Sequence, residues 1–307
     1  MQQTENLQQI FDKNFIADYK KLHEKMMPLS ANFSFFCSWR RTKTDGQKIV
    51  YDTSLNMFVF LPQEGLPQFP PLADYNVVNW DEYFNKYFYG RKQISFVTVP
   101  EALLKVWRNK FSTSLHAEEN RDLAEYLYDA VPFSSLSGRK YDKKRNHFNF
   151  LTKHFEYSYL PLTPDLVPQV KQFQKNWLEK QMDMETIKGH FLPKEDVLID
   201  YMLSNWSFFC PKYLQGSVIL INDEVVAYTI GEIVGSSIII HIEKANSKIH
   251  GLYQGISKDF LTQMLLEHPE IKIVNREEDM GDAGLRHAKM SYHPDGFSKN
   301  YNVQIKL

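Results

Sequence analysis

The sequence predicts an α+β protein with mixed sheets, built from two domains in tandem. The chain has 307 residues, 43% of them hydrophobic, which suits two cores of ordinary size. Strand-like runs follow one another as antiparallel meanders, and amphipathic helices flank them. Both halves end in a strand, a loop, a short basic helix and a closing strand. We therefore place an N-terminal domain at 1–160 and a C-terminal domain at 161–307, with a single large α+β domain as the alternative.

In the first half, apolar residues at helical spacing predict an amphipathic helix over 5–27. The turn Thr44-Asp45-Gly46 predicts a hairpin that joins strands 32–39 and 48–51. The other expected elements, in chain order, are strand 57–61, the proline-rich loop 62–71, helix 80–88, strand 94–99, helix 101–110, strand 123–128, a basic helical segment 136–155 and strand 155–160.

In the second half, Thr163 and Pro164 predict the start of a helix, because threonine caps helices and proline fits the first helical position. The remaining expected elements are a second helix around 197–202, strands 217–221, 225–233 and 237–242, helix 251–266, strand 271–274, a short helix 285–290 and strand 301–306. Two helices, three antiparallel strands and then helix, strand, helix, strand is the order of a GNAT-type acyltransferase domain. This analogy concerns the fold and does not fix the function.

Composition narrows the classes of function. A net charge of −1 gives no global basic field for nucleic acid, so such a contact needs a local patch. Arg139–Arg145 is such a patch, with five cations in seven positions; it predicts a phosphate or RNA contact, and a solvated helix face is the alternative. Cys37 and Cys210 lack metal or redox spacing, and we expect buried thiols in a reducing cytoplasm. The N-terminus is no signal peptide, and no apolar run approaches the ~20 residues of a membrane span.

The densest cluster of ionisable residues is the stretch 275–294, which follows the strand-like run 271–274. Carboxylates in a polar turn precede cations on a short helix, as in a polar cleft or a solvated surface loop. The residues that we expect to act in catalysis are Glu243, Asp279, Arg286 and Lys289. The residues that we expect to bind substrate are Asn275, Arg276, Tyr253, Tyr292, Lys144 and Arg145.

Each candidate has a structural alternative. Glu243 ends a strand, where it can accept a proton from an attacking amine, hold an ammonium group, or pair with Lys244 or Lys289. Asp279 can bind the amino group of a donor. Arg286 and Lys289 share a helix face, where either can stabilise an oxyanion or grip a phosphate, or both can pair with the preceding acids to fix the loop.

The remaining polar candidates also have both a functional and a structural interpretation. Asn275 can orient a substrate carbonyl or cap the turn, and Tyr253 and Tyr292 can line a cleft or pack in the core. Glu277 and Glu278 are expected to be solvated or paired. Four histidines show no arrangement of metal ligands, so we expect no metal: His241, His250, His287 and His293.

Five segments together resemble one family over roughly residues 30–303: NFSFFCSW, LSGRKYDKKRNHFNFL, HIEKANSKIHGLYQGISKDF, VNREEDMGDAGLRHAKMSYHP and FSKNYNV. They are similar to the C-terminal domain of phosphatidylglycerol lysyltransferase. The resemblance implies two tandem GNAT-like folds, as in the Fem-type peptidyltransferases. It also implies transfer of an aminoacyl group from aminoacyl-tRNA to a lipid or a peptidoglycan precursor. Characterised lysyltransferases carry a large membrane-embedded domain; this sequence has none, which weakens the case for a lipid acceptor.

The loop that would hold coenzyme A matches poorly. Coenzyme A-dependent GNAT enzymes place small residues at the start of the helix after the fourth strand, where backbone N–H groups hold the pyrophosphate. Lys248 and Gly251 match half of that pattern, but Tyr253 stands where a small residue is needed. We therefore expect no cofactor and an aminoacyl-tRNA donor that contacts Arg139–Arg145, with a small molecule or lipid headgroup as acceptor. A coenzyme A-dependent N-acyltransferase and a non-catalytic binding module are the alternatives.

Overall fold

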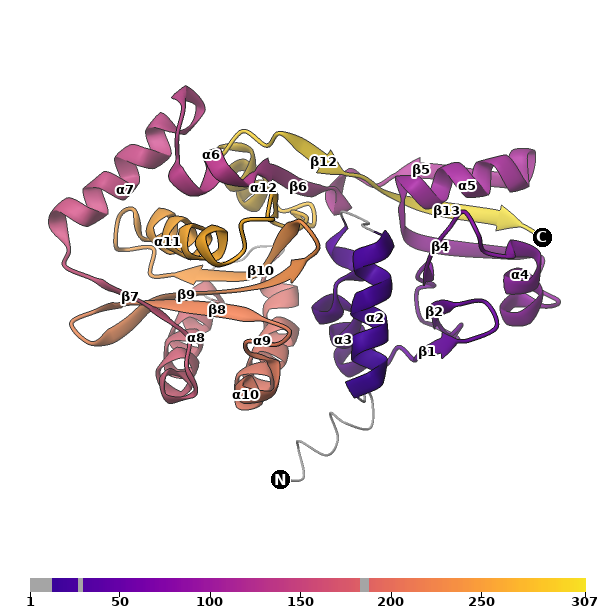
Figure 1. Cartoon of the computed structure of the whole chain (residues 1–307), viewed down its shortest axis with the longest axis horizontal. Coiled ribbons are helices and arrows are strands. Elements are labelled where there is room, and N and C mark those ends of the chain that lie inside the picture. The colour runs from indigo at the N-terminus through magenta and orange to yellow at the C-terminus, as the bar shows by residue number, and fades with distance from the viewer. Residues whose placement is uncertain (1–12, 27–29, 183–187) are drawn as a thin grey trace. The chain divides into compact units, whose positions relative to one another are not determined.

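The computed structural model describes residues 13–26, 30–182 and 188–307, which divide into two compact units (Figure 1). The first unit comprises Met1–Glu125 and Phe297–Leu307, and the second comprises Tyr126–Gly296. The units thus interleave along the chain, because the last strand returns to the first unit. The domain boundary predicted at residue 160 rests on the repeated order of elements in the two halves. It differs from the bounds of the compact units and stays a prediction.

The described part of the first unit contains two three-stranded sheets, of order β1-β2-β3 and β4-β13-β5. The strands are β1 (Ile49–Asp52), β2 (Met57–Phe60), β3 (Leu72–Ala73), β4 (Gln93–Pro100), β5 (Leu115–Glu119) and β13 (Asn300–Lys306). The helices are α2 (Lys13–Met26), α3 (Phe35–Thr44), α4 (Trp80–Phe88) and α5 (Glu101–Phe111). Strand β13 runs antiparallel to both β4 and β5. Trp80, Phe84 and Trp107 form the aromatic centre of the core beneath this sheet.

The segment 32–39 is helical, so the prediction of a strand there was wrong. Ser34 caps α3, since its side chain accepts a hydrogen bond from the Cys37 amide at 3.0 Å. Phe35, Phe36 and Trp39 are buried along this helix. Consequently Thr44 and Asp45 end α3, and the hairpin of this region joins β1 to β2. The helix expected over 5–27 is confirmed over Lys13–Met26, and its other positions lie outside the described residues.

The second unit is built on a sheet of order β12-β6-β11-β10-β9-β8-β7. The strands are β6 (Glu125–Asp129), β7 (Ser158–Pro161), β8 (Gln215–Ile221), β9 (Glu224–Val234), β10 (Ser237–Ala245), β11 (Ile273–Asn275) and β12 (Gly296–Ser298), where the chain leaves the unit. The helices are α6 (Ala130–Ser135), α7 (Asp142–His154), α8 (Val167–Met182), α9 (Lys188–Ser204), α10 (Trp206–Phe209), α11 (Leu252–Glu267) and α12 (Ala283–Met290). Helices α11 and α7 lie on one side of this sheet, and α8 packs on the other (Figure 1).

The site is positioned by β10 and β11, two neighbouring strands of this sheet that pair in parallel. Their pairing ends at Ile239 and Asn275, whereas β10 continues to Ala245. Beyond these residues β10 continues without β11 as a partner, and we call this gap in the strand pairing the opening. None of the helices in the described parts of the chain is long and apolar enough to span a membrane.

Candidate functional site

An ion pair bridges the opening beyond the paired part of β10 and β11. Arg276, the first residue after β11, reaches Glu243 on β10, with 2.6 Å between Nη2 and Oε1. The two side chains are only 13% and 8% exposed, so water screens their attraction weakly. Arg276 therefore fixes the position of the Glu243 side chain. Of the other partners considered for it, Lys244 pairs with Glu195 at 2.8 Å and Lys289 binds backbone carbonyls.

A second cation lies beside this pair. The Lys144 ammonium of α7 is 4.2 Å from the centre of the Tyr292 ring, and the Arg276 guanidinium is 5.1 Å from the same centre. Lys144 donates to Ser291 Oγ at 2.6 Å, and Gln254 of α11 donates to the Tyr292 hydroxyl at 3.1 Å. Burial and the neighbouring Arg276 lower the pKa of Lys144 to about 8. Among the contacts described above, Glu243 is the one carboxylate beside the two cations Arg276 and Lys144. An anion bound here would therefore meet a net positive charge.

Tyr253 forms another part of the wall of this opening. Burial raises the pKa of Tyr253, and the charge of Glu243 acts in the same direction. Hydrogen bonds from Trp177 and the Ala245 amide, together with the charge of Arg276, lower this pKa. Lys244 lies over the Trp177 ring at 4.2 Å. Aromatic rings thus lie beside a small number of charges in this region, a combination that is common in ligand sites.

The predicted residues Asp279 and Arg286 form a separate cluster. Asp279 is fully buried and accepts two hydrogen bonds from Arg286, at 2.9 and 2.8 Å. It also accepts from the Tyr126 hydroxyl at 2.5 Å and from the Gly281 amide at 2.9 Å. Burial alone would raise the pKa of Asp279, but these hydrogen bonds outweigh it and lower the pKa to about 2. The geometry is that of a clamp that fixes the loop, the structural alternative for this pair.

Lys289 completes this clamp from α12. Its ammonium group donates to the carbonyl oxygens of Arg276 at 2.6 Å and of Glu278 at 2.5 Å. The residue is 7% exposed. Burial lowers its pKa to about 8, although the nearby acids Glu278 and Glu277 act in the opposite direction. Lys289 therefore holds the backbone on both sides of Glu277.

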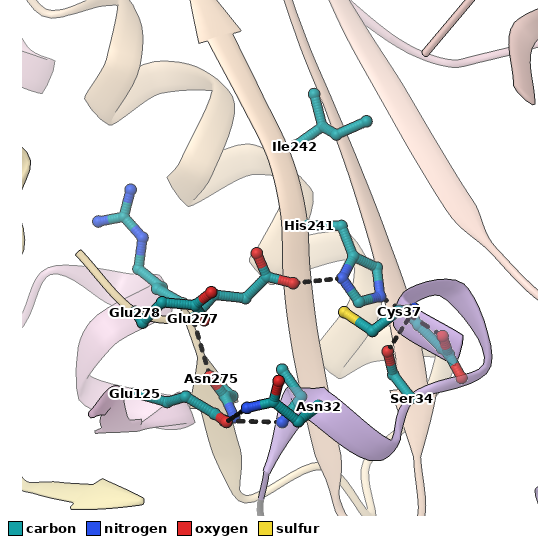
Figure 2. Close-up of polar contacts among 12 residues, drawn as sticks. Asn32, Ser34, Cys37, Glu125, His241, Ile242, Asn275, Glu277 and Glu278 are labelled. Atoms are coloured by element: carbon teal, nitrogen blue, oxygen red, sulfur yellow. Dashed lines mark hydrogen bonds and ion pairs between the residues drawn. The ribbon is translucent and has the colours of Figure 1, made fainter. Parts of the chain in front are cut away.

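The loop between β11 and α12 is also tied to β10. Asn275 accepts a hydrogen bond from the Glu277 amide at 2.8 Å, so its side chain caps the turn (Figure 2). The Glu277 carboxylate bonds the buried His241 ring at 2.7 Å, and Glu232 lies 3.4 Å from the other ring nitrogen. Glu277 and Met280 have φ angles of 56° and 51°, which non-glycine residues adopt at a cost. The clamp and the His241 contact oppose this cost.

The basic segment Arg139–Arg145 is held mainly by local contacts. Lys140 pairs with Asp295 at 2.7 Å, and Arg145 binds the Leu136 carbonyl at 2.5 Å and the Asp142 carboxylate. Arg145 therefore closes the loop before α7, while its neighbour Lys144 extends into the opening.

The structure thus sorts nine of the ten predicted residues into two groups, and the tenth, Arg145, lies outside both. Glu243, Arg276, Tyr253, Tyr292 and Lys144 meet at the opening. Asp279, Arg286, Lys289 and Asn275 build the adjacent loop. Arg276 belongs to both, through its side chain and its carbonyl oxygen. Sequence reasoning missed Gln254 and Ser291, for which an uncharged polar side chain gives little signal.

Comparison with known proteins gives a family match over most of the chain. The profile described as "Phosphatidylglycerol lysyltransferase, C-terminal" matches residues 69–304. An uncharacterized protein of Mycoplasmoides gallisepticum is 24% identical over 185 residues, which make up 59% of this chain and 56% of that protein. The chain therefore matches little more than half of the length of this relative.

Solved structures share the fold over nearly the whole chain. A conserved protein of unknown function from Bacteroides thetaiotaomicron has a TM-score of 0.77 at 24% identity, covering 94% of this chain and 97% of its own. L-PGS from Bacillus licheniformis has a TM-score of 0.61 at 12% identity, with 94% and 91% covered. FemX has a TM-score of 0.58 at 8% identity, with 94% and 96% covered. The tandem GNAT-like α+β fold predicted from the sequence is thereby confirmed.

Proposed function

Because the chain belongs to the family of phosphatidylglycerol lysyltransferase C-terminal domains, we propose that it transfers an aminoacyl group from aminoacyl-tRNA to an amine or hydroxyl acceptor. Family and fold support an aminoacyltransferase of the lysyltransferase and Fem type. The observation that carries the proposal is the pair of cations, Arg276 and Lys144, over the Tyr292 ring at the opening between β10 and β11.

In the proposed reaction, the acceptor nitrogen or oxygen attacks the carbonyl carbon of the aminoacyl ester. The new bond to that carbon forms, the ester bond to the tRNA ribose breaks, and the ribose hydroxyl leaves with a proton. Negative charge develops on the carbonyl oxygen, and Arg276 and Lys144 are placed to stabilise it. Glu243 orients the guanidinium of Arg276 and offers a carboxylate to the proton or ammonium group of the attacking acceptor.

Coenzyme A is not the donor in this proposal. Gly251 at the start of α11 has a φ of 86°, and a Cβ atom there would lie 2.1 Å from the His147 carbonyl oxygen of α7. The loop where a pyrophosphate would approach is therefore packed against α7. The half-buried Tyr253 lies in the first turn of α11, two residues after Gly251. The acceptor is a small molecule or a lipid headgroup, two sources of the same nucleophile.

The test uses tRNA charged with a mixture of radiolabelled amino acids, incubated with phosphatidylglycerol vesicles or with a small-molecule extract. Label in the organic phase indicates a lipid acceptor, and label in new water-soluble products indicates a small molecule. Arg276→Gln should slow transfer by about 100-fold or more, as loss of one oxyanion donor does. Lys171→Gln, which removes a cation of α8 paired with Asp200, is the matched control and should transfer normally. Transfer from acetyl-coenzyme A but not from charged tRNA would refute the proposal.

A further inference from the structure

A row of aromatic rings lies along α7, beginning one turn beyond Lys144. The rings of His147 and His250 stack with centres 4.4 Å apart and an interplanar angle of 26°. Phe150 meets His250 edge to face at 4.9 Å, and it stacks on His154 at 4.0 Å. We call these four residues the ring platform. Phe150, His154 and His250 are exposed and His147 is half-buried, so the rings face solvent within this unit.

Local structure explains why these rings form one surface. His147, Phe150 and His154 recur at a spacing of three and four residues, which places them on one face of α7. His250 comes from the loop between β10 and α11. Gly251 lets this loop approach α7, because a side chain there would overlap the His147 carbonyl. The platform is thus assembled from two segments about 100 residues apart in sequence, which helical spacing alone could not reveal.

The charge around the ring platform is positive. From Lys143 to His154 the chain holds four Lys or Arg residues and two histidines, with no Asp or Glu. Lys143, Lys153 and Lys248 are exposed beside the rings. Burial, His250 and Lys144 lower the pKa of His147, which favours a neutral ring that stacks as an aromatic group. Exposed aromatic rings framed by cations are the surface that single-stranded nucleic acid uses, with bases on the rings and phosphates on the cations.

We propose that the ring platform stacks the unpaired bases at the 3′ end of the tRNA donor and thereby directs its aminoacyl ester to the opening at Lys144. This inference rests on the proposed function. Ten residues separate Lys144 from His154, which is about 15 Å along a helix. That length accommodates about four stacked nucleotides at about 3.4 Å each. The ester, at the last nucleotide, would then lie beside Lys144 and Arg276.

The test measures binding of uncharged RNA hairpins by fluorescence anisotropy at one fixed salt concentration. One hairpin carries a short unpaired 3′ tail and the other is blunt. The full-length protein should bind the tailed hairpin more tightly, and Phe150→Ala and His250→Ala should each weaken that binding about tenfold, or about 1.4 kcal/mol. Phe150→Tyr keeps the ring and should restore binding. Tyr89→Ala removes a ring that is 89% exposed in the first unit and is the matched control.

The outcomes separate this inference from the proposed function. Equal binding of both hairpins, unchanged by Phe150→Ala, would overturn the ring platform and leave the tRNA donor intact. Lys153→Ala should weaken both hairpins alike and reduce the dependence on salt, as loss of one phosphate contact does. Failure of the wild-type protein to bind either hairpin would overturn the donor class together with the platform. Tail-dependent binding lost only in the ring variants supports the proposal.

Discussion

Replacing the buried carboxylate Asp279 by asparagine is the sharpest test of the loop clamp. The change is isosteric, but it removes the charge that accepts two hydrogen bonds from Arg286 and one from the Tyr126 hydroxyl. If Asp279 served to bind a substrate ammonium, its loss would cost folding little, because surface-like changes usually cost below about 1 kcal/mol.

The structure predicts a larger loss. Removal of one partner of a buried ion pair costs about 3–5 kcal/mol, since the other charge stays behind without compensation. Here Arg286 is 36% exposed, so water can reach the guanidinium that Asp279→Asn leaves behind. Asp279 itself is fully buried, and an asparagine nitrogen there would face the donors of Arg286. We therefore expect the lower end of that range, a loss of about 3 kcal/mol.

The measurement is urea-induced unfolding of the full-length protein, followed by circular dichroism for wild type and variant. Asp142→Asn is the matched control, because Asp142 also pairs with an arginine of this unit but its side chain is 52% exposed. Such an exposed pair is worth below about 1 kcal/mol. A loss for Asp279→Asn no larger than that for Asp142→Asn would refute the clamp and return Asp279 to the candidates for substrate binding.

Three further predictions concern single sites. Gly251→Ala should lower the free energy of unfolding by at least about 2 kcal/mol, because Gly251 has a φ of 86° and an added Cβ atom would overlap the His147 carbonyl oxygen. An unchanged melting temperature would contradict the packing of α7 on this loop. The pKa of Lys289 is lowered from 10.5 to about 8 in the folded state, so between these two pH values the unfolded state binds more protons than the folded state. The unfolding free energy of wild type should therefore rise with pH in this range, relative to that of Lys289→Met. A difference in unfolding free energy that does not vary with pH would rule this out. Arg276→Gln should raise the pKa of Lys144, measured by NMR titration of the lysine side chains, whereas an unchanged value would show that burial alone lowers it.

The sequence predicts the elements well where apolar periodicity is strong. Helix α4 has the predicted bounds, because Trp80, Tyr83, Phe84 and Phe88 recur at helical spacing and all are buried. Strand β5 was missed, since none of its residues is buried and its charged sequence carries no strand pattern. The aromatic-rich α3 was taken for a strand, as short apolar runs suit either structure and the capping role of Ser34 decides between them. The partners of β13 were beyond reach, because pairing to β4 and β5 joins segments about 200 residues apart.

For the candidate site, the sequence indicates the region but not the pairing of charges. Glu243 and the loop after β11 were both identified, because ionisable residues at the ends of neighbouring strands are visible in the sequence. Whether Asp279 faces a ligand or Arg286 depends on side-chain direction at single positions, which periodicity does not specify in a loop. The ring platform depends on a contact between α7 and a loop distant in sequence, and His250 was judged an ordinary histidine for that reason.

The two clusters of charge, around Glu243 and around Asp279, both contact Arg276. They can therefore lie side by side and still have different roles. Arg276 has its guanidinium fixed by Glu243 and its carbonyl oxygen fixed by Lys289. A cation held at both ends needs little reorganisation when charge develops nearby, which is the condition under which electrostatic stabilisation of a transition state is strong. Because Asp279 and Arg286 immobilise the loop that begins at Arg276, the clamp would preorganise this cation for the proposed reaction without contacting the substrate. Dense charge in a sequence therefore indicates the neighbourhood of this site, whereas the residues that we propose to act in the reaction are those that the clamp leaves facing the opening.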